Sequence, residues 1–446
     1  MIDFQATLDP ANGLAERSEA RPPAPPDDLL WRCLVRLRST AAERAGHTLT
    51  PRVVGAYGHS RSNTLVRGVG EAVERYALFP EGGPPPGAVT AATAAELGTR
   101  APDFADPGLA LGAPEARSLP LTWYPARRLR DGTDVHVPAP LVDYPDPSPQ
   151  AAHFDPTPSG AASGGSPGDA LRAALLETVE RDAFLTAWEA RLRPHRLRFP
   201  GPAGPGTARP GTARPGTAGP RAGARLRELR ALWGKVERAG LTPVLAELPT
   251  GLPGVVCTVG IVLDERRPVP LATVGCNATA DDDQAAWSML GALQEALQVR
   301  SVVLNSWSEE QRAEDVTGLP IRDDDDRLRY VASAQGHARV REWVDSFAAE
   351  RPPRTAPPVS TDELVRLLVA DGADPLLVDL TYRLPGPLRR MGWCAVKVVP
   401  AGYQALRLRE DHPFTWHARR LTTAPARTGL GALAASRFAW RPHPLP

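Results

Sequence analysis

The sequence contains almost no lysine and little cysteine. Of its 52 basic side chains, only Lys235 and Lys397 are lysines. Isolated cysteines are usually small buried apolar residues, and zinc or redox-dithiol sites need closely spaced pairs. No CxxC pair occurs among the four cysteines, so neither kind of site is indicated by Cys33, Cys257, Cys276 and Cys394.

Net charge is also nearly absent, at +1 with 52 basic and 51 acidic side chains. This balance gives no general attraction to nucleic acid or to an anionic membrane. The opening "MIDFQATLDP" has neither the basic nor the apolar region of a secretory signal. No run of about eighteen apolar residues occurs that could span a membrane. We therefore expect a soluble cytoplasmic protein that binds neither nucleic acid nor membrane.

The familiar catalytic motifs are missing too. There is no GxxxxGK[ST] phosphate loop, no GxSxG nucleophile turn and no HExxH metal motif. The glycine pattern "GLGALA" near residue 429 follows no predicted strand, and "RDDDDR" at 322–327 is expected to be a solvated loop. The chemistry must therefore come from some other pattern.

The chain has 446 residues, of which 42% are hydrophobic, so it can form a large core. We expect an N-terminal region over 1–50, consisting of a loose proline-rich leader followed by a helix at 28–45. A catalytic domain over 51–446 is expected to follow. Within it, 201–222 repeats "PGTAR" and is predicted to be a disordered insertion. A proline-rich tail occupies 441–446.

Helix and strand patterns alternate along the chain, which indicates the α/β class. The best-defined helix begins at "GSPGDALRAALLETVERDAF", where Ser166 suits the N-cap, Pro167 the first helical position and Asp169 the third. Other helices are expected up to residue 79, at 225–240, from about 280 to 303, and at 360–372. Strands are expected at 119–124, 134–142, 242–248, 254–263, 375–382 and 393–401.

One acidic phrase occurs on three of these helices. The sequence contains "EAVERY", "ETVERD" and "QEALQVR", with the pairs Glu71/Glu74, Glu177/Glu180 and Glu295/Gln298. Spacing of three residues places both members of a pair on one helix face. Small and apolar neighbours at helical spacing indicate that these faces point inward.

Buried carboxylates require cations, and Mg²⁺ is bound by carboxylates together with phosphate oxygens. The alternative is three solvated helix faces in which Glu and Arg form ion pairs. Repetition on three separate helices favours a shared site.

With these residues, the chain resembles the YcaO-domain family, and within it the azoline-forming cyclodehydratases of ribosomal peptide modification. The resemblance extends from about residue 50 to the end. It rests on "EAVERY", on "SGAASG" followed by "ETVERD", on "QEALQVR", on "DLT" at 379–381, on "VKVVPAG", and on the terminal "RPHPLP". It implies a YcaO-like α/β fold with mixed sheets and three glutamate-bearing helices around a central nucleotide site. Two departures are "YGHSRSN", which replaces an SGKG-like turn and offers Arg61 instead of lysine, and Ser159, which replaces an asparagine.

The resemblance also implies cofactors and residue roles. The cofactors would be ATP and Mg²⁺, and the terminal Pro446 would reach the active site as a base. Phosphates would face Arg181 and Arg300, whose planar guanidinium groups suit them. Glu295 and Gln298 would complete the nucleotide site on the third helix. The expected metal and nucleotide ligands are Glu71, Glu74, Glu177 and Glu180, with Asp169 as a further metal ligand.

The implied reaction is ATP-dependent conversion of Cys, Ser or Thr in a precursor peptide to thiazoline or oxazoline, through phosphorylation of the backbone amide oxygen. Alternatives are a related enzyme that forms thioamides or amidines, and a non-catalytic scaffold subunit. Expected partners are the precursor peptide and a separate leader-recognition protein that resembles adenylating enzymes. A flavin dehydrogenase and a second copy of the chain are further candidate partners.

Overall fold

Three sheets and the helices between them build the molecule. The computed structural model describes residues 2–38, 52–80, 83–104, 111–199, 220–281, 284–433 and 442–445. The sheets have the strand orders β1-β2-β3, β11-β10-β9-β8-β12 and β4-β5-β13-β14-β7, with β6 paired to β5. All pairings are antiparallel except β8 with β12. The predicted α/β class with mixed sheets is confirmed.

The strands have these bounds: β1 Ala15–Arg21, β2 Trp31–Leu37, β3 Val53–Gly58, β4 Val89–Ala92, β5 Leu121–Arg128, β6 Asp134–Pro138, β7 Ala161–Gly164, β8 His195–Leu197, β9 Thr242–Leu248, β10 Val256–Asp264, β11 Leu271–Thr279, β12 Ala348–Arg351, β13 Asp374–Asp379 and β14 Cys394–Ala401. The helices are α1 Phe4–Thr7, α3 Arg61–Leu78, α4 Ala94–Leu97, α5 Pro167–Glu189, α6 Pro220–Arg238, α7 Gln284–Ser306, α8 Glu309–Arg312, α9 Asp324–Ala332, α10 Ala334–Ser346, α11 Thr361–Ala370, α12 Gly386–Met391, α13 Ala418–Thr422 and α14 Ala424–Thr428.

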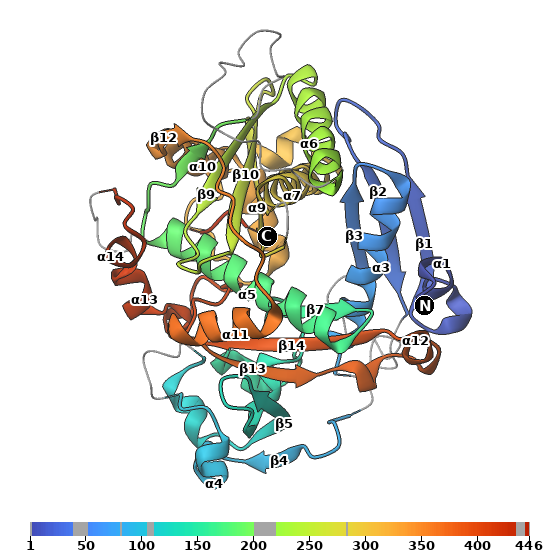
Figure 1. Ribbon diagram of the computed structural model, residues 1–446, viewed down its shortest axis with the longest axis vertical. Helices are drawn as coiled ribbons and strands as arrows, with labels where there is room; N and C mark the ends of the chain where they lie inside the picture. The colour runs from blue at the N-terminus through green and yellow to red at the C-terminus, as the bar shows by residue number, and fades with distance from the viewer. Residues whose placement is uncertain are drawn as a thin grey trace.

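Helix α5 crosses the middle of the molecule, between the five-stranded and six-stranded sheets (Figure 1). It contacts β14 and β7 on one side and β11 on the other. Its buried residues include Leu175, Val179, Phe184 and Trp188, which lie on several faces. A helix buried nearly all round is held by tertiary packing, so α5 forms the centre of the core.

Helices α3 and α7 each contact two of the three sheets. Helix α3 packs on β2 and β3 and also contacts β7 and β14, while α7 covers β10 and β11 and touches β3. The long helices α3, α5 and α7 therefore converge where the three sheets meet. This convergence brings the three copies of the repeated acidic phrase into one region.

The N-terminal region differs from the prediction. Residues 31–37 form strand β2, so the helix expected at 28–45 is wrong. The burial of Cys33, Val35 and Leu37 follows the two-residue period of a strand. The leader expected to be loose contains α1 and β1, and β1 pairs with β2. Strand β2 in turn pairs with β3, so one sheet joins residues from both sides of position 50.

Other boundaries agree more closely. Ser166 caps α5 by accepting the Asp169 N–H, and Pro167 is the first helical residue, as predicted. The acidic run at 322–327 is not a loop, because Asp323 caps α9 and the next residues form its first turn. The repeat segment lies outside the described residues up to 219, and α6 begins at Pro220.

Candidate nucleotide site

Five glutamates from three helices meet where α3, α5 and α7 converge. Glu71 and Glu74 come from α3, Glu177 and Glu180 from α5, and Glu295 from α7. We call these five residues the glutamate cluster. Mutual electrostatic effects show their proximity, because Glu71 and Glu177 both raise the pKa of Glu74, and Glu177 also raises the pKa values of Glu180 and Glu295.

Two glycines allow α7 to lie directly on its sheet. Gly260 and Gly275 face each other across β10 and β11. A Cβ atom at Gly260 would lie 2.6 Å from the Ala292 carbonyl carbon, and one at Gly275 would lie 2.5 Å from the Cβ of Glu295. Side chains at these positions would push the helix away. The bare strand backbone therefore positions Glu295 beside β11.

Arg181 is the central cation of the cluster. Its Nη1 lies 3.1 Å from Glu180 Oε1 and 3.9 Å from Glu295 Oε1, and its Nη2 lies 3.3 Å from Glu177 Oε1. Backbone donors hold two of the carboxylates, because Cys276 N–H donates to Glu295 over 2.6 Å and Ala278 N–H donates to Glu180 over 2.9 Å. One guanidinium thus connects α5 with α7.

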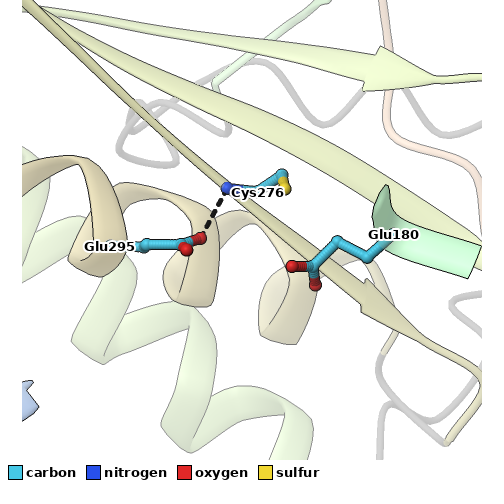
Figure 2. A group of neighbouring side chains, drawn as sticks. All are labelled: Glu180, Cys276 and Glu295. Atoms are coloured by element: carbon cyan, nitrogen blue, oxygen red, sulfur yellow. Dashed lines mark hydrogen bonds between the residues drawn. The ribbon is translucent and has the colours of Figure 1, made fainter. Parts of the chain in front are cut away.

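Figure 2 shows Glu180, Cys276 and Glu295 facing a common space, with the Cys276 N–H bonded to Glu295. One ligand atom of each residue lies within 4.8 Å of the others, a spacing compatible with a metal ion. However, Arg181 Nη1 also donates to Cys276 Sγ over 3.5 Å and so contacts all three residues. This part of the cluster already holds its cation in the guanidinium.

Glu74, unlike the glutamates around Arg181, is not paired with a cation within the described residues. Glu71 pairs with Arg75 over 2.9 Å, but Glu74 has no hydrogen bond or ion pair in the part of the chain that the structure describes. Burial, followed by the charges of Glu71 and Glu177, raises the pKa of Glu74 well above its usual range, against the opposing charges of Arg75 and Lys397. A partly buried carboxylate without a partner needs a cation. Glu74 and the adjacent Glu177 therefore suit Mg²⁺, which prefers carboxylate and phosphate oxygens.

Burial perturbs the other ionisable groups at the site. It raises the pKa of Glu180 to about 8, against the opposing charge of Arg181, and it also raises that of Glu295. Burial lowers the pKa of Lys397 to about 8, although the charges of Glu177 and Glu74 favour its charged form. Clustered pKa shifts of this kind are typical of functional sites.

Two charged residues were missed by the sequence analysis. Arg67 donates to Gln294 over 2.9 Å. Burial lowers the pKa of Arg67, against the opposing charges of Glu295, Glu71 and Glu180. Its place four residues before Glu71 puts it on the same helix face, so the spacing could have revealed it. Lys397, on β14, had no comparable local signal.

Three predicted residues have contacts outside the glutamate cluster. Asp169 accepts from Ser166 Oγ over 2.7 Å at the exposed start of α5, roughly 12 Å along the helix from Glu177. Gln298 donates to the Gly55 carbonyl over 3.4 Å. Arg300 is buried, and its Nη2 lies 2.7 Å from Asp264 Oδ2. Its Nη1 donates to the Asp27 carbonyl over 2.7 Å.

Two of these placements differ from the expected roles, which stay predictions. The Asp169 carboxylate accepts from the hydroxyl of the N-cap residue Ser166 at the exposed start of α5. Arg300 lies five residues after Glu295, which turns it to another side of α7, so it holds the N-terminal segment instead of facing phosphate. Pro446, the expected terminal base, lies outside the described residues.

A small cavity adjoins the glutamate cluster. Its volume is about 60 Å³, and Arg181 belongs to both the cavity wall and the cluster. Polar and apolar residues both line it: Leu111, Leu141, Asp155, Thr157, Ser159, Gly160, Thr178, Arg181, Lys397, Val399, Pro400, Gln404, Ala405, Leu406 and Thr415. Asp155 also lines an open cleft of about 750 Å³, so cleft and cavity adjoin at this residue.

The described tail residues 442–445 are buried beside this cavity. Leu445 lies in the core with Phe184 and Trp188, and the His443 carbonyl accepts from Arg327 over 2.8 Å. His443 also bonds the Arg407 carbonyl over 2.7 Å. Arg407 directly follows the lining segment 404–406, so the tail is fixed next to the cavity wall.

None of the helices in the described residues has the length and apolar character needed to span a membrane.

Comparison with known proteins gives one family and several related folds. The model of the family described as YcaO cyclodehydratase, ATP- and Mg²⁺-binding, matches residues 55–404. The curated proteins give no match.

Solved structures similar to this chain include a heterocyclase in complex with substrate and cofactor, with 18% identity, a TM-score of 0.63, and coverage of 90% of this chain and 51% of that chain. Another is YcaO from Methanopyrus kandleri bound with AMPPCP and Mg²⁺, with 18% identity, a TM-score of 0.59, and coverage of 89% and 90%. A third is the E. coli microcin synthetase McbBCD complex, with 13% identity, a TM-score of 0.53, and coverage of 85% and 86%. The chain spans about half the length of the heterocyclase it matches. At these identities the similarity shows the fold.

Proposed function

The chain belongs to the YcaO cyclodehydratase family, which binds ATP and Mg²⁺, and from this premise we propose that it forms azolines in a ribosomally made precursor peptide. The observation that carries the proposal is the glutamate cluster, in which α3, α5 and α7 bring five carboxylates together. In this proposal Glu74 and Glu177 hold Mg²⁺, with Glu71 beside them. Residues 51–446 form the proposed catalytic domain.

The proposed reaction begins when a Cys, Ser or Thr side chain of the peptide adds to the preceding backbone carbonyl. The carbonyl oxygen takes the terminal phosphoryl group of ATP, and ADP leaves. The amide nitrogen then forms a C=N bond while the C–O bond breaks, so the oxygen leaves in phosphate. The protons from the side chain and the amide pass to a base. Phosphorylation is needed because the amide oxygen alone is a poor leaving group.

The protein's part in this reaction is to position the reactants and to compensate charge. Arg181 connects the carboxylates of α5 and α7 and also lines the cavity. The cavity lining includes the charged Arg181 and Lys397 together with the apolar Leu111, Leu141 and Leu406, a mixture suited to a peptide. The open cleft adjoining at Asp155 offers the peptide a path to the cavity.

The buried tail supports the azoline-forming branch over formation of thioamides or amidines. Its anchored residues end at Leu445, and we propose that Pro446 provides its terminal carboxylate as the base. A purely scaffolding role is disfavoured by Glu74, because a partly buried carboxylate with no hydrogen bond or ion pair among the described residues reduces stability unless it binds a cation.

By analogy with the similar McbBCD complex, which has been solved with pro-MccB17 bound, we propose that a separate protein resembling adenylating enzymes delivers the leader peptide. A flavin dehydrogenase would be required only if the azolines are oxidised.

Turnover by the complex of this chain, its partner and the precursor peptide tests the proposal. We expect loss of one water per ring by mass spectrometry, dependent on Mg²⁺ and ATP and abolished in Glu177→Gln. Glu237→Gln is the matched control, because Glu237 is exposed on α6. Ring formation without ATP, or undiminished formation by Glu177→Gln, would exclude the proposed function.

A further inference from the structure

Lys397 is a buried lysine in a chain that uses arginine for nearly every cation. The only other lysine, Lys235, is exposed in the last turn of α6. Lys397 is 3% exposed in the middle of β14. A lysine is seldom buried unless its ammonium meets a partner. The two side chains also differ in shape, because the ammonium is a compact point charge and guanidinium is a broad plane.

The surrounding backbone fixes where this ammonium lies. Lys397 Nζ donates to the Thr157 carbonyl over 2.6 Å, and the next residue, Val398, donates its N–H to the Gly160 carbonyl over 2.7 Å. Gly160 has a φ of +82°, and a Cβ there would lie 2.3 Å from the Val398 carbonyl oxygen. Only glycine permits this close contact between the 157–160 loop and β14. The loop and the strand therefore hold Lys397 in one position.

That position is the boundary between the cavity and the glutamate cluster. Lys397 lines the cavity, and the charges of Glu177 and Glu74 act on its ammonium. An ammonium has three N–H donors, of which one is used on Thr157. Within the described residues, Arg75 and Arg181 are each within ion-pair distance of a glutamate, whereas Lys397 is paired with none.

We propose that Lys397 is a catalytic residue that contacts the terminal phosphoryl group of ATP while this group passes to the peptide oxygen. The inference rests on the proposed function. Glutamate-bound Mg²⁺ would place the phosphates on one side of Lys397, and the cavity would place the peptide on the other. The cavity has room for roughly four water-sized groups, which suits a reacting amide and not a nucleotide.

In this step, the peptide oxygen forms a bond to the γ-phosphorus. The bond from that phosphorus to the β–γ bridging oxygen breaks, and its electron pair leaves with ADP. Lys397 keeps its proton throughout and offsets negative charge on the transferring oxygens. Its contact is to the terminal phosphoryl group alone, so ADP should not require it.

Calorimetric titration of Mg·ATP and Mg·ADP into the wild type, Lys397→Met and Lys235→Met tests this assignment. We expect Lys397→Met to weaken Mg·ATP binding by roughly tenfold or more, as expected for a lost charge-assisted hydrogen bond, and Mg·ADP binding by less than about threefold. Lys235→Met should match the wild type for both nucleotides. Equal weakening of both nucleotides by Lys397→Met, or no weakening, would overturn the assignment.

A second measurement needs no variant at Lys397. With only two lysines, acetylation of each by acetic anhydride can be followed separately by mass spectrometry. Mg·ATP should protect Lys397 more than Mg·ADP does and should leave Lys235 unchanged, whereas equal protection by both nucleotides would count against the assignment. If the wild type binds neither nucleotide, the proposed function fails and this inference with it. If the wild type prefers Mg·ATP and Lys397→Met keeps that preference, only this inference fails.

Discussion

Replacing Glu74 with glutamine should stabilise the protein while removing its response to Mg·ATP. Glu74 lies partly buried without a hydrogen bond or ion pair in the described part of the chain, beside Glu71 and Glu177. A buried polar group without a partner costs about 1–3 kcal/mol, and a charge costs more. Glutamine keeps the shape and loses the charge, so we expect Glu74→Gln to raise the free energy of unfolding by about 1–2 kcal/mol.

Thermal unfolding can measure this change. An unfolding entropy of about 2.1 cal/mol/K per residue gives roughly 0.9 kcal/mol/K for the 446 residues. The expected rise in melting temperature is therefore about 1–2 °C. In the wild type, saturating Mg·ATP at about 100 times its Kd adds about 2.7 kcal/mol, or about 3 °C. Glu74→Gln should lose most of that increase, because it removes a proposed Mg²⁺ ligand.

The effect should depend on pH in a defined direction. The pKa of Glu74 is higher in the folded chain than its usual value of 4.5, so the folded state binds the proton more tightly. Wild-type stability therefore falls as the pH rises from about 4.5 toward the folded pKa, whereas glutamine does not titrate. The advantage of Glu74→Gln should be small near pH 5 and largest at alkaline pH.

The exposed Glu237→Gln on α6 is the control and should change stability by less than about 0.5 kcal/mol. A lower melting temperature for Glu74→Gln at alkaline pH, with the Mg·ATP increase intact, would refute the reasoning.

Three further substitutions test the scaffold around the site by denaturant unfolding. Gly160→Ala should destabilise the protein by more than about 2 kcal/mol, because the added Cβ would clash with the Val398 carbonyl oxygen at a residue with positive φ. Gly372 also has a positive φ but has open space around it, so Gly372→Ala should cost only about 1 kcal/mol. Equal costs would contradict the close contact at Gly160. Leu445→Ala should cost about 2–5 kcal/mol because Leu445 is fully buried, and a cost near zero would show that the tail is not anchored. Arg407→Met should cost about 3–5 kcal/mol because it removes the guanidinium that pairs with the buried carboxylates of Glu189 and Glu410, and a neutral result would contradict the buried network.

Local patterns predicted the helices that carry the site. Ser166 and Pro167 define the start of α5 through capping chemistry, which depends on neighbours in sequence. The three-residue spacing of Glu71/Glu74 and Glu177/Glu180 predicted a shared inward face, and both pairs do meet in the structure. Helix caps and helix faces can be predicted from sequence because residues close together in the chain determine them.

Features set by tertiary contacts were not predictable in the same way. Strand β2 was read as a helix because its apolar residues also fit a helical spacing, and only pairing with β1 and β3 decides between the two. Arg300 and Arg181 are both arginines on site helices, so the sequence suggested the same role for both. Arg300 instead pairs with Asp264 on β10, which is distant in sequence and could not be foreseen from local spacing. The place of Lys397 at the site depends on the packing of the 157–160 loop beside β14, a contact between segments that are far apart in sequence.

The most direct test of the account is calorimetric titration of Mg·ATP into the wild type and Glu177→Gln, with Glu237→Gln as control. Glu177 pairs with Arg181 and its charge acts on Glu74 of α3, so its neutralisation should disturb the centre of the proposed nucleotide site. We expect the wild type and Glu237→Gln to bind alike and Glu177→Gln to lose at least about tenfold in affinity. Equal affinity in all three proteins would contradict the claim that the glutamate cluster is the nucleotide site.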